Sequence, residues 1–320
     1  MSERPTFTIG ITIGDMNGIG PEVILKTLED NRIMHYCQPV IYGSSKTLSY
    51  YKKMLDMEDF SFHIAKDTSQ LSRKHPSVMN CWQEEVNITP GDSSSEMGKY
   101  ALIALEKATD DLKAGHLDAI VTAPVNNFSI RQHQPHFRGQ TEYITARLEE
   151  TDSMMVLASD AAVVGLVTTH VPLRDVTALV TPQKVESKIR LMDKMLRKDM
   201  LIQKPRIAVF GLNPHAGDNG LLGHEDQEII QPAIENCHKD GILVYGPYPA
   251  DGFFGAGHQR RFDGILAMYH DQGLAPFKSL SFGGGVNISL GLPFLRTSPD
   301  HGTAYALAGK QQAKADSMIE

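Results

Sequence analysis

Short apolar runs that end abruptly at polar or glycine residues recur along this chain. A run of this kind is typical of a buried strand in a parallel sheet. Three of the runs lead, within four residues, to a histidine: residues 162–168, 206–211 and 264–269 lead to His170, His215 and His270. Because ligands of open α/β sheets collect beyond the carboxyl ends of the strands, this pattern predicts that the three histidines lie at the functional edge of a sheet.

Helical patterns alternate with these strands. Residues 96–112 place apolar side chains on one side of a helix and stop at Gly115, and residues 185–200 and 226–240 repeat the pattern. Further strands are predicted at residues 6–13, 39–43 and 118–124, and further helices at residues 21–28, 46–57 and 141–148. This alternation favours an α/β fold with a mainly parallel sheet and helices on both faces.

Length and composition narrow the class of protein. At 320 residues the chain fits two domains or one large α/β unit. Its 41% hydrophobic and 22% charged residues are those of a soluble globular enzyme, and a net charge of −7 without a Lys/Arg run argues against nucleic-acid binding. No apolar run approaches the length of a membrane helix, no secretory signal is recognised and the three cysteines are dispersed. We therefore expect a cytoplasmic enzyme with no membrane partner.

A glycine-rich segment joins the first predicted strand to the first helix. Residues 14–22, GDMNGIGPE, place three glycines before a helix with Pro21 in its first turn. Glycines ahead of a helix N-terminus let a phosphate or carboxylate approach the backbone. A tight turn without a ligand explains the segment equally well, and its spacing is not the G-x-G-x-x-G fingerprint. Thr141, near the start of a later helix, has two similar interpretations: an N-cap or an anion contact.

The three histidines form a candidate metal site. Imidazoles without thiolate partners suit Zn²⁺, Co²⁺ or a similar ion, and three protein ligands leave positions open for a substrate. A single histidine at a strand end is more often a hydrogen-bonded structural residue, and the residues alone leave both interpretations open. Lys278 and Arg296 follow the third histidine along the chain. Beside a metal they indicate an anionic substrate, a phosphate ester or a carboxylate, and two solvated surface charges are the alternative.

Taken together, these segments resemble one family, the 4-hydroxythreonine-4-phosphate dehydrogenases of pyridoxal phosphate biosynthesis, known as PdxA. The matching motifs follow the family's order over nearly the whole chain: GDMNGIGPE at 14–22, GQTEYI at 139–144, TTHVPL at 168–173, GLNPHAGDNG at 211–220, GPYPADGFF at 246–254, MYHDQGLAPFK at 268–278 and VNISLGLPFLRTSPDHGTA at 286–304. The resemblance implies two α/β/α domains with a fold like the isocitrate and isopropylmalate dehydrogenases. It also implies an active site in the interdomain cleft, at the interface of a homodimer.

The resemblance implies roles for individual residues as well. A divalent metal ion (Zn, Mg or Co) would be bound by His170, His215 and His270, which need not all come from one subunit. Substrate contacts would fall on Gln140, Thr141, Lys278, Asn287 and Arg296. NAD, or NADP, would be bound by Gly14, Asp15, Gly18, Gly20, His301, Gly302 and Thr303. As a separate hypothesis about the mechanism, Asp251 and Asp271 are candidates to orient ligands or relay a proton.

The same resemblance suggests how the domains divide the chain. Residues 1–126 with 265–320 would form the first α/β domain, on the dinucleotide side. Residues 127–264 would form the second, on the side of dimerisation and the metal ligands.

The implied activity is oxidation at C3 of 4-phosphooxy-threonine, a phosphorylated hydroxy-amino acid, followed by decarboxylation to 3-amino-2-oxopropyl phosphate. Two departures leave the substrate open: Gln140 stands where the family commonly has His, and Asn127 where it has Lys. A dehydrogenase of phosphorylated threonate or erythronate is therefore an alternative. A metal-dependent phosphate-ester hydrolase is a second, although it gives HGTAYALAGK at 301–310 no task. A non-catalytic sugar-phosphate-binding protein is the third.

Overall fold

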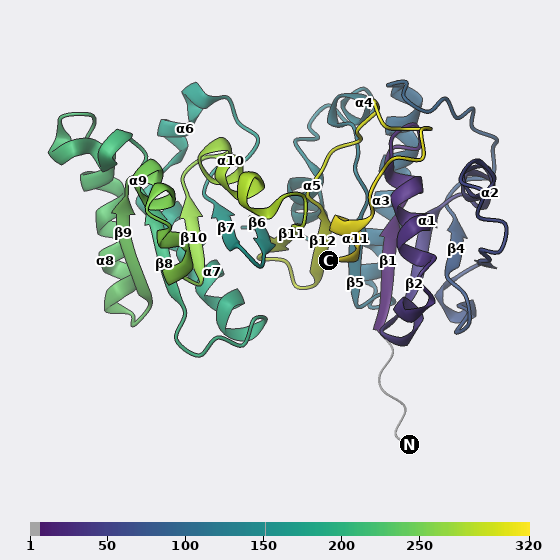
Figure 1. The fold of residues 1–320 in the computed structure, drawn as a ribbon, viewed down its shortest axis with the longest axis horizontal. Helices are drawn as coiled ribbons and strands as arrows, with labels where there is room; N and C mark the ends of the chain where they lie inside the picture. Colours follow the sequence, from purple (N-terminus) through teal and green to yellow (C-terminus); the bar gives the residue numbers. More distant parts are fainter. Residues whose placement is uncertain (1–6, 151) are drawn as a thin grey trace, which may run out of the picture. The chain divides into compact units, whose positions relative to one another are not determined.

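The computed structural model describes residues 7–150 and 152–320, and the chain divides into two compact units (Figure 1). Unit 1 comprises Met1–Thr151 with Leu292–Glu320, and unit 2 comprises Asp152–Gly291. The chain therefore passes from unit 1 into unit 2 and back again, and each unit contains six of the twelve described strands.

Unit 1 contains a parallel sheet with the strand order β3-β4-β2-β1-β5-β12. Each neighbouring pair in this order is parallel. The strands are β1 (Phe7–Thr12), β2 (Cys37–Gly43), β3 (His63–Ala65), β4 (Ser77–Asn80), β5 (Ala119–Thr122) and β12 (Leu295–Pro299). Its described α-helices are α1 (Gly20–Leu28), α2 (Ser45–Met54), α3 (Ser95–Lys113), α4 (Asn127–Arg131), α5 (Gln140–Arg147) and α11 (Asp316–Ile319), and 3₁₀ turns occupy Asn31–His35 and Thr68–Gln70.

Helix α3 shows how the sequence pattern produces this layer. Ser94 caps the helix by accepting a hydrogen bond from the Glu96 amide (3.2 Å). Gly115, with a φ of +76°, supplies the left-handed residue just beyond its end. The apolar side chains of α3 are buried and the helix packs against β1, β2 and β5. The periodicity of residues 96–112 therefore specified both the helix and its buried face.

Unit 2 contains a mixed sheet with the strand order β11-β6-β7-β10-β8-β9. Strands β7, β10, β8 and β9 are parallel, whereas β6 is antiparallel to both β7 and β11. The strands are β6 (Met154–Ser159), β7 (Ala162–Leu166), β8 (Arg206–Phe210), β9 (Leu243–Tyr248), β10 (Gly264–Ala267) and β11 (Val286–Leu290). Its described α-helices are α6 (Leu173–Leu179), α7 (Pro182–Lys198), α8 (Gln231–Lys239), α9 (Ala250–Gly255) and α10 (His270–Ser281), with 3₁₀ turns at Pro214–Gly220 and His258–Arg261 and a π-helical turn at Asp226–Ile230.

Both faces of the sheet in unit 2 are covered. Along β8, Ile207 and Val209 belong to the core that α7 and α8 build, whereas Ala208 and Phe210 belong to a second core that includes side chains of α9 and α10. Alternate residues of a strand point to opposite faces, so one strand contributes to both cores. The predicted α/β class, with a mainly parallel sheet, is confirmed.

The observed units do not follow the expected domain boundaries after residues 126 and 264. Residues 265–291 belong to unit 2 because β11 pairs with β6 and α10 packs against β7. Residues 127–150 belong to unit 1, where α4 packs against α3. These contacts join segments far apart in sequence, and no local pattern marks them.

Most of the predicted elements are present with ends shifted by a few residues. The helix expected over 226–240 is instead a π-helical turn followed by α8. The first strand runs from Phe7, since residues 1–6 lie outside the described part. Cys37, Cys81 and Cys237 are free thiols. Among the described residues, no helix is both long and apolar enough to span a membrane.

Candidate active site

The three strands that lead to the histidines lie next to one another in unit 2. Strand β10 pairs in parallel with β7 on one side and with β8 on the other. His170 follows β7, His215 follows β8, and His270 is the first residue of α10, just beyond β10. The strand-end placement predicted from the apolar runs is therefore confirmed.

Two side chains tie these strand ends together. Gln272 donates from Nε2 to the carbonyl oxygen of Gly211 (2.7 Å) and accepts from the Met268 amide (2.7 Å). Thr168 donates from Oγ1 to the carbonyl oxygen of Met268 (2.8 Å). Beyond the last strand residue, such backbone groups need partners other than the sheet ladder. Gln272 and Thr168 supply them, and so fix the ends of β7, β8 and β10 relative to one another.

His170 and His270 line the same pocket. Their ring centroids are 5.9 Å apart, and the pocket, of about 380 Å³, is also lined by Leu173 and Val176. Asp271 contacts His270 at Nδ1 (2.7 Å). A carboxylate bound to one ring nitrogen fixes the orientation and tautomer of an imidazole whose other nitrogen binds a metal. Nε2 of His270 is therefore the nitrogen suited to a cation.

His215 begins an unusual left-handed turn. Residues 215–220 all have positive φ, with values from 42° to 93°. Left-handed backbone costs an L-residue roughly 1–2 kcal/mol, because Cβ approaches the following carbonyl oxygen. Only Gly217 and Gly220 in this run escape that cost. Conformations of this kind persist where the surrounding structure holds them, and they cluster at functional sites.

The described residues of one chain contain no complete metal site. Across residues 7–150 and 152–320, no group of three or more His, Cys, Asp or Glu side chains is arranged to hold a metal ion. The convergence of His170, His215 and His270 inside a single chain is therefore not observed. Of the three, His170 and His270 lie together, and His270 has the carboxylate partner typical of a metal ligand. His170 and His270 therefore have the donor chemistry of metal ligands but make up only two of the three predicted ligands.

The other predicted residues of unit 2 lie on three elements. Asp251 is exposed in the first turn of α9, and Lys278 is exposed in the last turn of α10. Asn287 lies on β11, where its Oδ1 is buried and has no hydrogen-bond partner in the described chain. Because buried acceptors are nearly always hydrogen-bonded, Asn287 Oδ1 is open to a donor from a ligand.

In unit 1 the structure brings Arg296 and Thr141 together. Arg296, on β12, is 2% exposed and donates from Nη1 to Thr141 Oγ1 (2.9 Å). It also donates from Nε and Nη2 to Thr122 Oγ1 (3.1 and 2.5 Å). Burial lowers the pKa of Arg296 to about 10, while the charge of Glu142 acts in the opposite direction. The guanidinium therefore stays charged at neutral pH and holds a threonine hydroxyl on each side.

The structure contradicts the interpretation of Thr141 as the N-cap of α5. Gly139 is the N-cap of α5 and no side chain caps it, so Thr141 lies inside the first turn and does not cap the helix. Gln140 donates from Nε2 to the carbonyl oxygen of Ala123 (3.3 Å). Its Oε1 is buried without a partner in the described residues. Gln140 thus presents an unused acceptor beside Thr141.

The glycine-rich loop meets the carboxyl-terminal segment in unit 1. The Ile19 amide donates to the carbonyl oxygen of Thr303 (3.0 Å), and a Cβ at Gly18 would lie 2.8 Å from the same oxygen. Asp15 is fully buried and accepts from the Tyr305 hydroxyl (2.7 Å). Burial raises the pKa of Asp15, and its hydrogen bonds with Tyr305 and the backbone act against that rise. Two motifs proposed separately for nucleotide binding are therefore in contact.

The remaining residues predicted for the nucleotide lie in the same two segments. Gly14 has a φ of +71°, and a Cβ there would lie 2.5 Å from the carbonyl oxygen of Pro124. Gly20 is buried at the start of α1. His301 is half-buried with Nδ1 near the Gly302 carbonyl oxygen (3.1 Å), and a Cβ at Gly302 would meet nothing within 4 Å. The backbone at Gly302 is thus open to a close approach.

Sequence reasoning missed several residues that support these segments. Asn126 donates from Nδ2 to the Tyr305 hydroxyl (3.0 Å) and, through Oδ1, caps α4. Tyr305 lies inside a quoted motif, but nothing in that motif marks its bond with Asp15. Thr122, Gln272 and Asp226 carry no recognisable signal either, because their roles depend on partners far away in sequence.

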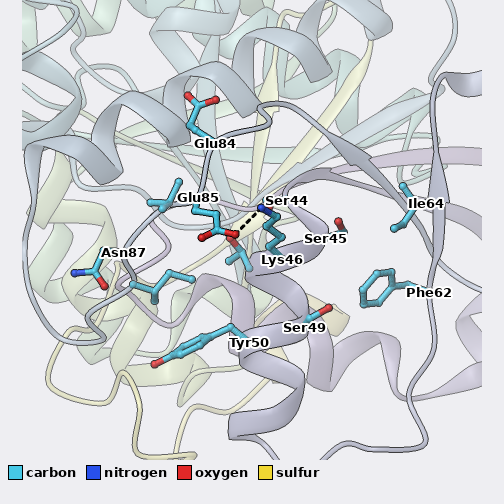
Figure 2. Close-up of a pocket in the computed structure, with 13 residues that line it drawn as sticks. Ser44, Ser45, Lys46, Ser49, Tyr50, Phe62, Ile64, Glu84, Glu85 and Asn87 are labelled. Carbon is cyan, nitrogen blue, oxygen red and sulfur yellow. Dashed lines mark hydrogen bonds and ion pairs between the residues drawn. The ribbon is translucent and has the colours of Figure 1, made fainter.

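A larger pocket of unit 1 lies at the start of α2 and contains none of the predicted site residues. The pocket has a volume of about 630 Å³. Figure 2 shows its lining, which includes Ser44, Lys46, Tyr50 and Phe62. The Lys46 ammonium pairs there with the Glu85 carboxylate (2.9 Å). The charge of Lys46 is therefore already matched within the pocket.

Comparison with known proteins identifies the family. Residues 35–320 match the family described as pyridoxal phosphate biosynthetic protein PdxA. This chain belongs to the PdxA family. The 4-hydroxythreonine-4-phosphate dehydrogenase of Bacteroides thetaiotaomicron is 48% identical, covering 99% of this chain and 87% of the relative. A second relative, from Oceanobacillus iheyensis and provisionally named D-threonate 4-phosphate dehydrogenase, is 38% identical over 100% of this chain and 96% of its own length.

Solved structures support the PdxA fold. The crystal structure of 4-hydroxythreonine-4-phosphate dehydrogenase from Klebsiella pneumoniae has a TM-score of 0.81 at 34% identity, covering 99% of this chain and 96% of that one. A β-decarboxylating dehydrogenase from Thermococcus kodakarensis has a TM-score of 0.53 at 12% identity over 98% of this chain and 81% of that one, which shows likeness of fold alone.

Proposed function

We propose that this protein is an NAD-dependent, divalent-metal-dependent 4-hydroxythreonine-4-phosphate dehydrogenase of pyridoxal phosphate biosynthesis. It oxidises C3 of 4-phosphooxy-threonine, and decarboxylation then gives 3-amino-2-oxopropyl phosphate. The observation that carries the proposal is the 48% identity, over 99% of this chain, to the enzyme of that name in Bacteroides thetaiotaomicron. NAD is the proposed dinucleotide and NADP its alternative.

Histidines and a carboxylate of unit 2 serve the cation in this proposal. His270 binds through Nε2 while Asp271 holds Nδ1, and His170, 5.9 Å away between ring centroids, binds beside it. A further histidine of the predicted set comes from the second subunit of a homodimer. When bound, the dinucleotide supplies a hydride acceptor, and the cation (Zn, Mg or Co) supplies positive charge that acidifies a hydroxyl group and favours decarboxylation.

In this proposal two kinds of side chain bind the substrate: cationic groups and hydrogen-bond acceptors. Arg296, charged and buried, and Lys278, exposed, suit phosphate and carboxylate groups. The buried oxygens of Gln140 and Asn287 suit donors, such as the amino and hydroxyl groups of the substrate. Thr141, held by Arg296, offers a hydroxyl beside Gln140. The expected position of the site, in a cleft between domains at a dimer interface, stays a prediction, as does a proton-relay role for Asp251.

The nucleotide is assigned to the contact between residues 14–20 and 301–303. Gly18 lies against Thr303 there, Gly302 faces open space, and Asp15 is anchored by Tyr305. Glycines in this position let the backbone approach a pyrophosphate closely. Asp15, Gly14, Gly20 and His301 then shape the loop around it.

One specific observation favours a second candidate substrate. The relative provisionally named D-threonate 4-phosphate dehydrogenase is 38% identical over 100% of this chain. Threonate phosphate carries a hydroxyl group where the amino acid carries an amine, and both groups donate to an acceptor such as Gln140 Oε1.

The test is the rate of NADH formation with 4-phosphohydroxythreonine, and separately with phosphothreonate, in the presence of NAD and Zn²⁺ or Mg²⁺. Faster turnover of the amino acid supports the proposal, and turnover of phosphothreonate alone supports the second candidate. Release of free phosphate without NADH would instead indicate a hydrolase. His215→Ala should abolish turnover with an unchanged circular dichroism spectrum, whereas His238→Ala, at an exposed position of α8, serves as the matched control.

A further inference from the structure

The carboxylate of Asp226 lies within the loop that carries His215. Asp226 is fully buried and is the first residue of the π-helical turn Asp226–Ile230. Its Oδ1 accepts from the Leu212 amide (2.7 Å), and its Oδ2 accepts from the amide of Asn213 (3.3 Å) and from Asn213 Nδ2 (2.9 Å). Three donors immediately before His215 therefore point at one carboxylate.

The backbone encloses this carboxylate on two sides. A Cβ at Gly211 would lie 2.5 Å from Asp226 Oδ1, and a Cβ at Gly217 would lie 3.1 Å from Oδ2. Gly211 precedes the three donors and Gly217 follows His215 by two residues. The chain thus wraps around the carboxylate, with room for hydrogen bonds and none for side chains at these two positions.

The conformation of His215 requires such an anchor. The left-handed backbone of residues 215–220 is unfavourable at each non-glycine position, so contacts elsewhere must hold it. Water would serve as a hydrogen-bond partner for the Leu212 and Asn213 amides if the segment opened. A buried carboxylate favours the closed form because it meets all three donors at once, and hydrogen bonds to a charged acceptor are the stronger kind.

We propose that Asp226 is a positioning residue that sets the direction in which His215 is presented. This inference rests on the proposed function, in which His215 is a metal ligand. In this proposal Asp226 contacts neither metal nor substrate, because both of its carboxylate oxygens accept hydrogen bonds from Leu212 and Asn213. It acts on the loop, and through the loop on the histidine, as buried partners of metal ligands do in other proteins.

The neighbouring Glu225 offers a matched control. Glu225 Oε2 also accepts from Asn213 Nδ2 (2.7 Å), but Glu225 is half-buried and contacts neither of the two backbone amides. Glu225→Gln removes a charge next to Asp226 while leaving the backbone anchor intact. Asp226→Asn keeps the shape of the anchor but turns an amide NH₂ group toward one of the donors.

The experiment compares Co²⁺ binding by full-length wild type, D226N and E225Q, using calorimetry without substrate or dinucleotide. Hydrogen–deuterium exchange of residues 211–220 is measured on the same samples. We expect D226N to bind Co²⁺ about 10- to 100-fold more weakly and to exchange faster in this segment, with E225Q like wild type. A purely structural role would lower the melting temperature of D226N without changing the Co²⁺ affinity of the folded protein.

The outcomes separate this inference from the proposed function. Wild type that binds Co²⁺, together with D226N of equal affinity or unchanged exchange, would overturn the inference alone. Wild type that binds no cation would overturn the proposed metal site, and the inference with it. If D226N does not fold, N213A removes one of the three donors and should show smaller changes of the same sign in both measurements; unchanged Co²⁺ affinity in N213A then counts against the inference.

Discussion

Arg296 donates a hydrogen bond from Nη1 to Thr141 Oγ1, 2.9 Å away, although 155 positions separate the two residues. The guanidinium is 2% exposed and binds Thr122 as well. Arg296 therefore connects β12 to β5 and to the first turn of α5. Its position makes it a structural residue of unit 1 as well as a candidate for anion binding.

Arg296→Lys should lower the free energy of unfolding by about 2–3 kcal/mol, because an ammonium cannot reproduce the planar set of donors to both threonines. Urea unfolding at neutral pH measures the change. Arg32→Lys is the control, since Arg32 pairs with Asp30 at an exposed position (2.6 Å) and such pairs contribute little. Equal stability of R296K and R32K would contradict the assigned role.

Gln272→Glu should destabilise unit 2 by about 1–3 kcal/mol. The substitution keeps an acceptor for the Met268 amide but replaces the Nε2 donor that binds the Gly211 carbonyl oxygen. Thermal and urea unfolding report the loss, and exposed Gln203→Glu controls for the added charge. Because Gln272 ties β8 to β10, Q272E should also weaken Co²⁺ binding, whereas Q203E should not.

The free energy of unfolding should depend on pH through the carboxyl group of Asp15. Burial raises the pKa of this carboxyl above its usual value of 3.8, so the folded state takes up a proton before the unfolded state as the pH falls. Wild type should therefore gain stability relative to Asp15→Asn as the pH drops through the raised pKa, with the gain complete below 3.8. Urea unfolding of both proteins from neutral pH downward measures the difference. A difference that is flat over this range would refute the raised pKa.

His270→Ala should abolish NADH formation and reduce Co²⁺ affinity, while leaving the fold intact because the side chain is 39% exposed. Asp271→Asn should have a smaller effect of about 10- to 100-fold on affinity, since it disturbs only the orientation of the ring. Calorimetry and circular dichroism on both variants, with His238→Ala as control, make the comparison. Full Co²⁺ affinity in H270A would remove His270 from the metal site.

The sequence alone determined the parts of this protein that depend on local pattern. Apolar runs of strand length predicted β7, β8 and β10. The polar residues that follow each run marked the end of the strand, and so predicted that His170, His215 and His270 lie at strand ends. The periodicity of residues 96–112 predicted α3 and its buried face. The motif order also indicated the family. The strands and the helix follow from side-chain spacing within one element, and the family follows from the order of motifs, both of which can be read directly along the chain.

Only the tertiary structure decided which distant residues meet. Pairing of β11 with β6 moved residues 265–291 into unit 2, against the expected boundary. Burial of Arg296, the anchor of Asp226 and the bridge made by Gln272 each join positions far apart in sequence. Within residues 7–150 and 152–320, the packing brings together His170 and His270 but no group of three side chains that could hold a metal ion. Such contacts depend on how elements pack in space, and the spacing of residues along the chain does not specify that packing.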